Sequence, residues 1–372
     1  MIADSIHGAN FIIKSPRILF LWGNHMSSEV NFFQTAQKSM KKLVLATCTL
    51  LAITMGLMFV GCQNELAPKP STTKVYEFTS KPRILTDYKS PNNTGAEYTY
   101  VAFGDWPQTI KDKNVKIGNE NLTRGGLLYE MGSDGNYYVK QGRDYYKVEP
   151  IVWRVLNKDY TGTGEALLLA EKILTGGIPY HVHADDRTIE GAGTKSANPD
   201  TVFPNNYEYS TVRAWLNGKY ESDDLQKTEY AERGFLQTAF TKEAQKLITP
   251  TVIDNSGAST FDAGKDLDKA TDYACQNITD KIFLLSKQEA TTEEYGFAKY
   301  DDSGNGNTRI RVTTDYAKAT GELITDSRWW LRSPYDSQGG YGRVINKDGS
   351  STINLVTTDY VGVVPALYIT LQ

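Results

Sequence analysis

Short apolar and β-branched runs, separated by Gly, Asp and Asn, dominate the chain from about residue 98 onward. Residues 151–156 (IVWRVL) and 166–170 (ALLLA) are continuous or nearly continuous apolar runs. This pattern predicts central strands that are buried on both faces. Residues 98–103 (YTYVAF) alternate as a strand does, and residues 104–107 (GDWP) are expected to end that strand.

Turn signals predict two hairpins. Residues 133–136 (SDGN) favour a turn within a hairpin near residues 128–140. Asp348-Gly349 separates the runs 343–346 and 351–356 and is a strong hairpin signal. A buried strand is also expected at residues 282–285, and a last one near residues 361–371, where Pro365 marks an edge or a bulge.

Helices are expected to be few and short. Ser210, Thr241 and Ser286 are capping residues ahead of runs that end at Gly218, before Pro250 and near Glu294. Residues 175–206 and 251–280 show no period and predict long loops. The pattern as a whole indicates an α+β fold of mixed, mostly antiparallel sheets with a few short helices and long loops.

The segment 40–62 (MKKLVLATCTLLAITMGLMFVGC) has a different character. Two lysines precede eighteen largely apolar residues, which end at Gly61-Cys62. A basic region, an apolar region and a small residue before the cut define a secretory signal. The segment resembles a bacterial lipobox, although residues 59–61 depart from the strict Leu-Ala-Gly form, and this implies acylation of Cys62. The alternative is a transmembrane anchor, because eighteen residues could just span a bilayer.

The expected domain organisation follows from this signal. Residues 1–39 are an extension upstream of a true start at Met40, and residues 40–61 are the lipoprotein signal peptide. Residues 62–97 are a tether that contains Pro68 and Pro70. Residues 98–372 form a single globular domain that is long enough to bury a large core. The protein is expected to be exported and lipid-anchored to the cell envelope, on its periplasmic or surface side.

Charge and cysteine content exclude some classes of protein. Removing residues 1–61 takes away 5 of 40 basic and 2 of 44 acidic residues, which leaves 35 and 42 and a net charge of −7. This balance gives no footprint for nucleic acid. Besides Cys48 in the signal and Cys62, only Cys275 remains, so no intrachain disulfide is expected. Cys275 has no His or Asn motif beside it and is not expected to be a nucleophile.

Six segments occur together, in order, in one bacterial family. They are residues 100–108 (YVAFGDWPQ), 149–156 (EPIVWRVL), 210–217 (STVRAWLN), 283–286 (FLLS), 329–334 (WWLRSP) and 362–367 (GVVPAL). The chain therefore resembles the domain-of-unknown-function family numbered 6273 over residues 98–371. Val364 replaces the arginine that is usual in the last motif. The end of the chain is also similar to C-type-lectin-like domains of the formylglycine-generating type, which carry variable loops on a rigid base.

The Trp and Arg motifs are interpreted as structural. The residues concerned are Trp153, Arg154, Arg213, Trp215, Trp329, Trp330 and Arg332. They could line a cleft by cation–π stacking. The favoured interpretation is that the indoles are buried while the guanidinium groups satisfy loop carbonyls.

Two acidic or histidine-containing segments are weak metal candidates. His181 and His183, next to Asp185-Asp186, would present both rings on one face of a strand, but they lie in an expected loop. Asp301 and Asp302 begin an oxygen-rich turn, yet position twelve is Val312, so the turn is not an EF-hand. No metal and no cofactor is expected.

The sequence carries no P-loop, no Gly-x-Ser-x-Gly, no His-Glu-x-x-His and no dinucleotide fingerprint. The leading hypothesis is a lipid-anchored binding or adhesion-type module without catalytic activity, whose partner besides the membrane is an unknown protein or glycan. Its ligand-binding candidates lie in residues 335–360, which are expected to form an exposed surface: Tyr335, Tyr341, Arg343, Asn354 and Tyr360. The alternatives are a cell-envelope enzyme, such as a glycan hydrolase with a carboxylate pair, and a purely structural envelope protein.

Overall fold

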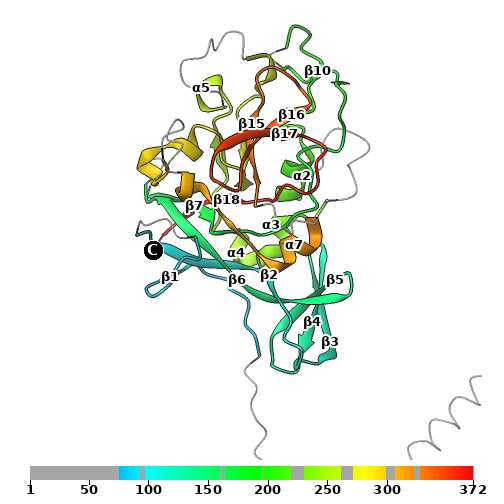
Figure 1. The fold of residues 1–372 in the computed structure, drawn as a ribbon, viewed down its shortest axis with the longest axis vertical. Coiled ribbons are helices and arrows are strands. Elements are labelled where there is room, and N and C mark those ends of the chain that lie inside the picture. Colours follow the sequence, from blue (N-terminus) through cyan, green and yellow to red (C-terminus); the bar gives the residue numbers. More distant parts are fainter. Residues whose placement is uncertain are drawn as a thin grey trace, which may run out of the picture. The chain divides into compact units, whose positions relative to one another are not determined.

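A nine-stranded antiparallel sheet forms the centre of the molecule (Figure 1). The computed structural model describes residues 75–92, 97–159, 162, 164–194, 196–218, 230–260, 271–298, 306–321 and 327–371. The strands of the sheet are β1 (Arg83–Leu85), β2 (Tyr100–Ile110), β3 (Ile117–Arg124), β4 (Leu127–Gly132), β5 (Tyr137–Gln141), β6 (Asp144–Asn157), β7 (Glu165–Ala170), β13 (Ile282–Phe283) and β18 (Ala366–Thr370). Cys62, Asp301 and Asp302 lie outside the described residues.

Strand β6 organises this sheet because it pairs on both of its edges. One edge pairs with β2 from Tyr100↔Arg154 to Ile110↔Tyr146. The other edge pairs first with β5 and then, from Trp153↔Ala170 onward, with β7. The two apolar runs expected to be central strands are therefore neighbours in the middle of the sheet, and residues 166–170 are fully buried.

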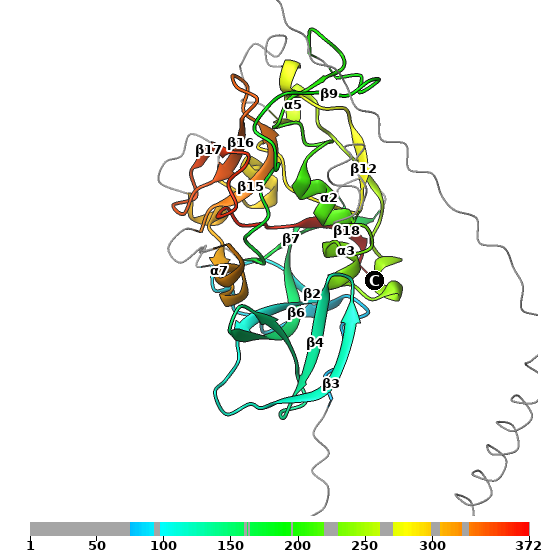
Figure 2. The same ribbon diagram turned by 90° about the vertical axis from the view of Figure 1, so that its right-hand side faces the viewer.

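Smaller sheets lie beside the large one (Figure 2). A three-stranded antiparallel sheet contains β15 (Trp329–Pro334), β16 (Tyr341–Ile345) and β17 (Ser351–Leu355). The two-stranded pairs are β8 (Lys172–Ile173) with β14 (Val312–Thr313), β9 (Arg187–Thr188) with β10 (Thr201–Val202), and β11 (Thr251–Ile253) with β12 (Ile278–Asp280). Both predicted hairpins are present, as β4–β5 and β16–β17.

Every helix in the described chain is short. The α-helices are α2 (Thr211–Asn217), α3 (Phe235–Ala239), α4 (Lys242–Gln245), α5 (Gly257–Thr260) and α7 (Asp315–Gly321). Single 3₁₀ turns occur at Thr271–Tyr273, Glu289–Thr291, Glu293–Tyr295 and Gly306–Arg309. None of the helices that the structure describes is long and apolar enough to cross a membrane. The α+β fold with mostly antiparallel sheets is confirmed.

The predicted caps can be compared one by one. Ser210 caps α2 by accepting a hydrogen bond from the Arg213 amide, and Gly218 ends this helix with φ of 60°. Thr241 caps α4 in the same way. The prediction of a single helix after Ser286 is wrong. The segment forms two separate 3₁₀ turns, because Thr292 between them is extended with ψ of 119°.

Residues 104–107 do not end the first strand as expected, since β2 continues through them. A β-bulge between Ala102 and Asp105 absorbs the break in the pattern, and Gly104 adopts φ of 71° there. A Cβ at Gly104 would lie 2.5 Å from the Phe240 ring. Glycine is therefore favoured at position 104 for two reasons. It tolerates the positive φ, and it has no Cβ that would clash where the C-terminal end of α3 packs on β2.

The folded unit also includes described residues upstream of residue 98, starting with Tyr76, whose amide donates to the Gly135 carbonyl. The segment expected as a tether includes β1, which pairs with β2. Buried Asp105 holds this segment by accepting hydrogen bonds from the Tyr76 hydroxyl at 2.6 Å and the Thr79 amide at 2.9 Å. The described part of residues 62–97 thus packs on the sheet as part of the domain.

Candidate ligand-binding cavity

Arg154 of the IVWRVL strand is held in a buried ion pair. Its Nε and Nη2 atoms donate to the two carboxylate oxygens of Glu171, each at 3.0 Å, and Nη1 donates to the Thr308 carbonyl. Both side chains are completely buried. Burial alone would raise the pKa of Glu171, but Arg311 and Arg154 outweigh it and lower that pKa below its ordinary range. Every guanidinium nitrogen of Arg154 and both carboxylate oxygens of Glu171 are hydrogen-bonded, and the pair joins β6 to the end of β7.

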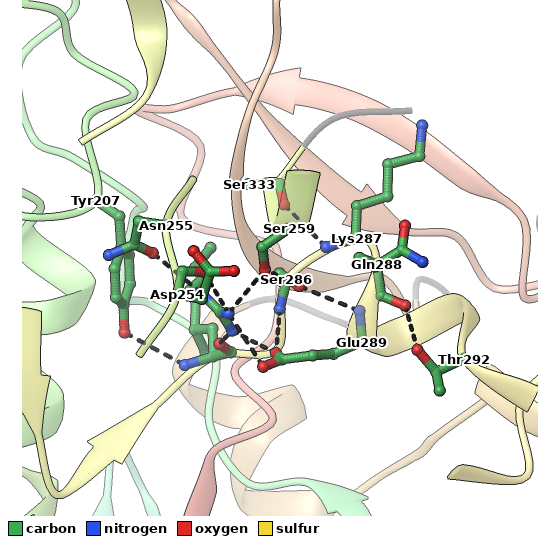
Figure 3. A network of polar contacts seen from close by, with 12 residues as sticks. Tyr207, Asp254, Asn255, Ser259, Ser286, Lys287, Gln288, Glu289, Thr292 and Ser333 are labelled. Carbon is green, nitrogen blue, oxygen red and sulfur yellow. Dashed lines mark hydrogen bonds and ion pairs between the residues drawn. The ribbon is translucent and has the colours of Figure 1, made fainter. Parts of the chain in front are cut away.

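Arg332 is held in a second buried network. Its partners Asn255, Ser259 and Glu289 are among the residues labelled in Figure 3. Arg332 forms a bidentate pair with Glu289, and its remaining donors reach Asn255 Oδ1 and the carbonyls of Leu284 and Asp254. Ser286 and Glu289 bond each other's amides, the reciprocal arrangement of a capping box. Because every donor of the guanidinium is used within the protein, this network holds loops to β15 and offers little to a ligand.

Arg213 follows the same plan. Its Nε and Nη2 atoms donate to Asp280 at 2.7 and 3.0 Å, and Nη1 donates to the Glu208 carbonyl. The tryptophans of these motifs are buried as expected, with Trp153 and Trp329 completely so. Their indole groups donate to the carbonyls of Phe103 and Arg309. The contacts favour the structural interpretation of the Trp and Arg motifs.

The expected binding surface over residues 335–360 is only partly exposed. Arg343 and Asn354 are buried, which corrects the expectation of an exposed surface at both positions. The Arg343 guanidinium lies 5.2 Å from the centre of the Tyr335 ring, and Asn354 accepts a hydrogen bond from Thr358. Residues 342–345 of β16 are all buried, so both faces of this strand are covered. Asn354 pairs with Gly342, which places it on the face opposite to Arg343, and packing on both faces therefore buries the two side chains. Tyr335 and Tyr341 are half-buried and Tyr360 is 44% exposed.

His181 and His183 do come together, with ring centres 5.3 Å apart. His181 is buried and its Nδ1 lies 3.1 Å from the Thr211 hydroxyl, so this ring belongs to the packing around the start of α2. Within the described ranges, no group of three or more His, Cys, Asp or Glu residues could hold a metal ion. Burial raises the pKa of Cys275 to about 12, so its thiol is protonated and unreactive at neutral pH.

A cavity of about 380 Å³ lies where several elements meet β2. Helices α3 and α7 both pack against β2, and α2 packs on α3 (Figure 1). Four aromatic side chains contribute to the cavity wall: Trp106 of β2, Trp215 of α2, Tyr316 of α7 and Tyr230. Leu127 and Ile178 add aliphatic surface. A concave site of this size and lining is typical of small-ligand sites.

Polar groups in the cavity wall come mainly from threonines. Thr175, Thr238 and Thr320 line it, and the hydroxyls of Thr175 and Thr320 are 3.2 Å apart. The Trp106 indole N–H donates a hydrogen bond to the Leu174 carbonyl. In contrast, the Trp215 indole N–H and the Tyr316 hydroxyl make no hydrogen bond to the part of the chain that the structure describes, and neither is a buried unsatisfied atom, so both are open to solvent in the cavity. Both are donors available to a ligand.

Sequence reasoning did not find this cavity. Trp215 was interpreted as structural, and Trp106 was noted only as part of the segment YVAFGDWPQ. The lining residues are spread from position 106 to position 320, and no local spacing links them. No local signal marks the two tryptophans, since Trp106 lies within β2 and Trp215 within α2, where core residues also lie.

The fold and the cavity define an α+β protein with an aromatic-walled pocket on its central sheet. Residues 163–371 match the model of the family DUF6273, described as a domain of unknown function. Since this match spans more than half of the chain, the protein belongs to that family. The first two segments that carried the resemblance, residues 100–108 and 149–156, lie upstream of the matched range. No curated protein and no solved structure matches the chain.

Proposed function

We propose that this protein is an exported, lipid-anchored binding module whose ligand site is the aromatic cavity on β2. The observation that carries the proposal is a preformed cavity of about 380 Å³ in which Trp215 and Tyr316 keep donors without protein acceptors. Unpartnered donors inside an aromatic pocket are unfavourable unless solvent or a ligand satisfies them. Anchoring through acylated Cys62 would hold this pocket at the cell envelope.

A glycan hydrolase, the competing class, needs two carboxylates on either side of the bond that is cleaved. None of the described residues in the wall of the cavity is Asp or Glu. The buried carboxylates Glu171, Asp280 and Glu289 are each paired with an arginine outside the cavity. The cavity therefore supports binding more than hydrolysis.

The β15–β17 sheet supports two further proposals. It presents half-buried Tyr335 and Tyr341, whose ring centres are 6.3 Å apart, as a second contact surface. We also propose that this sheet corresponds to the end of C-type-lectin-like domains, as the sequence resemblance implies. A Tyr341→Ala variant tests the surface and keeps the contact between Arg343 and the Tyr335 ring.

A thermal-shift screen of small metabolites and sugars tests the proposed site. Ile178→Trp places a large side chain at the half-buried cavity wall, and Val252→Trp makes the same change at a 63% exposed position elsewhere. Compounds that stabilise the native chain should still stabilise the Val252→Trp variant and lose their effect on the Ile178→Trp variant. Leu127→Trp repeats the blockade from β4. Equal stabilisation of all variants would move the site elsewhere.

A further inference from the structure

We infer that the ligand of this cavity is a neutral saccharide unit, an inference that rests on the proposed function. Three properties of the cavity point to this class: the orientation of its aromatic rings, the chemistry of its free donors, and the lack of charge in its described lining.

The aromatic rings form walls in different orientations. The Trp106 and Trp215 rings meet at 87° with centres 6.0 Å apart, and Trp106 meets Tyr316 at 81° and 6.1 Å. The rings thus pack edge to face on one another, and at 3%, 7% and 5% exposure Trp106, Trp215 and Tyr316 leave only part of their surface open to the cavity. Aromatic faces carry a negative quadrupole, which attracts groups with partial positive charge. The C–H groups on the face of a pyranose ring are such groups, and they are also apolar enough to displace water from an aromatic wall.

The free donors suit hydroxyl oxygens. The Trp215 indole can only donate. Burial raises the pKa of Tyr316 above its ordinary value, so its hydroxyl stays protonated and can both donate and accept. The Thr175 and Thr320 hydroxyls, 3.2 Å apart, donate to backbone carbonyls of the protein, so they are acceptors for a ligand on the same wall. Sugar hydroxyls, which donate and accept in turn, complement this mixture better than a purely apolar ligand does.

The described lining also disfavours a charged ligand. It contains no carboxylate that could neutralise a cation. Its one charged residue is Arg233, whose side chain is exposed, so an ion pair with an anion there would be weakened by water and salt. The cavity volume lies near the lower end of small-ligand sites, which fits one or two sugar units.

The test is calorimetric titration of the full chain, held in a detergent without a sugar headgroup. The probes are methyl glucoside, N-acetylglucosamine, glucuronic acid, choline and p-cresol. The two neutral sugars should bind, and their affinity should not change with salt. Trp215→Phe keeps the ring but loses the donor and should weaken binding about tenfold, as should Tyr316→Phe. Tyr145→Phe, at a half-buried tyrosine outside the described lining of the cavity, is the matched control.

Binding of glucuronic acid, choline or p-cresol in preference to the neutral sugars would overturn the saccharide inference while leaving the proposed cavity function standing. The same conclusion would follow from neutral-sugar affinities that Trp215→Phe and Tyr316→Phe leave unchanged. If none of the five probes binds, the inference is wrong, and the Ile178→Trp screen then decides separately whether the cavity binds any ligand.

Discussion

At the scale of single residues, the protein uses buried arginines as anchors. Arg154, Arg213 and Arg332 each pair with one carboxylate and spend their other donors on loop carbonyls. Their sequence motifs, Trp-Arg and Arg-x-Trp, allowed the structural role to be predicted. The partners Glu171, Asp280 and Glu289 could not be predicted, because they are distant in sequence or stand in unremarkable contexts.

Glu171→Gln should destabilise the fold by about 3–5 kcal/mol, since it leaves the buried charge of Arg154 without its partner. Burial and the charge of Arg154 already lower the pKa of Arg311 to about 9, so that guanidinium would lose its compensation as well. Chemical denaturation measures the change. Glu294→Gln, at an exposed position, should have almost no effect.

The same pair predicts a pH dependence. Because the pKa of Glu171 is lowered in the folded state, its contribution is complete above the pKa of an unfolded glutamate, about 4.3, and is lost as the pH falls through the lower folded value. The unfolding free energy of the native chain should drop in this acidic range. The drop should be smaller in Glu171→Gln, and an identical pH profile would contradict the ion-pair account.

At the scale of elements, local signals were reliable and long-range ones were not. The hairpin at Asp348-Gly349 and the caps Ser210 and Gly218 were predicted because their causes lie within a few residues. The continuation of β2 through Gly104 was missed, since pairing with β6 and packing under Phe240 are not visible in the sequence. The same reason explains why β1 was assigned to a tether.

Gly104→Ala should cost clearly more stability than a positive φ alone explains. A left-handed conformation costs a non-glycine residue about 1–2 kcal/mol. Gly142 has φ of 60° and open space around it, so Gly142→Ala should show only that cost. Gly104→Ala adds the clash with Phe240. Thermal unfolding of both variants makes the comparison, and equal losses would mean that β2 and Phe240 can separate without penalty.

At the scale of the whole molecule, the α+β class and the family were predictable from strand patterns and ordered motifs, whereas the cavity was not. Its walls come from β2, β4, α2, α3, α7 and the segment after β8, so it exists only once the chain has folded. The prediction that Arg343 and Asn354 lie on an exposed surface was wrong for a related reason. Residue type suggested contact chemistry, but packing on both faces of the β15–β17 sheet buries the two side chains.

Export and anchoring also belong to this scale. Mass spectrometry of the membrane-extracted protein should find a lipid-modified Cys62 at the mature N-terminus. Cys62→Ser should release the protein from the membrane fraction. A mature N-terminus upstream of Met40 would refute both the lipid anchor and the proposed start.

The central claim is that the cavity on β2 is the ligand site, and NMR of the chain labelled with ¹⁵N-tryptophan tests it most directly. Each indole N–H gives one signal, which a Trp→Phe variant assigns. Adding a compound that stabilises the protein should shift the signals of Trp215 and Trp106, which line the cavity, and leave Trp330, buried next to Tyr180, unchanged. Shifts confined to Trp329 and Trp330, or no indole shift at saturation, would contradict the account.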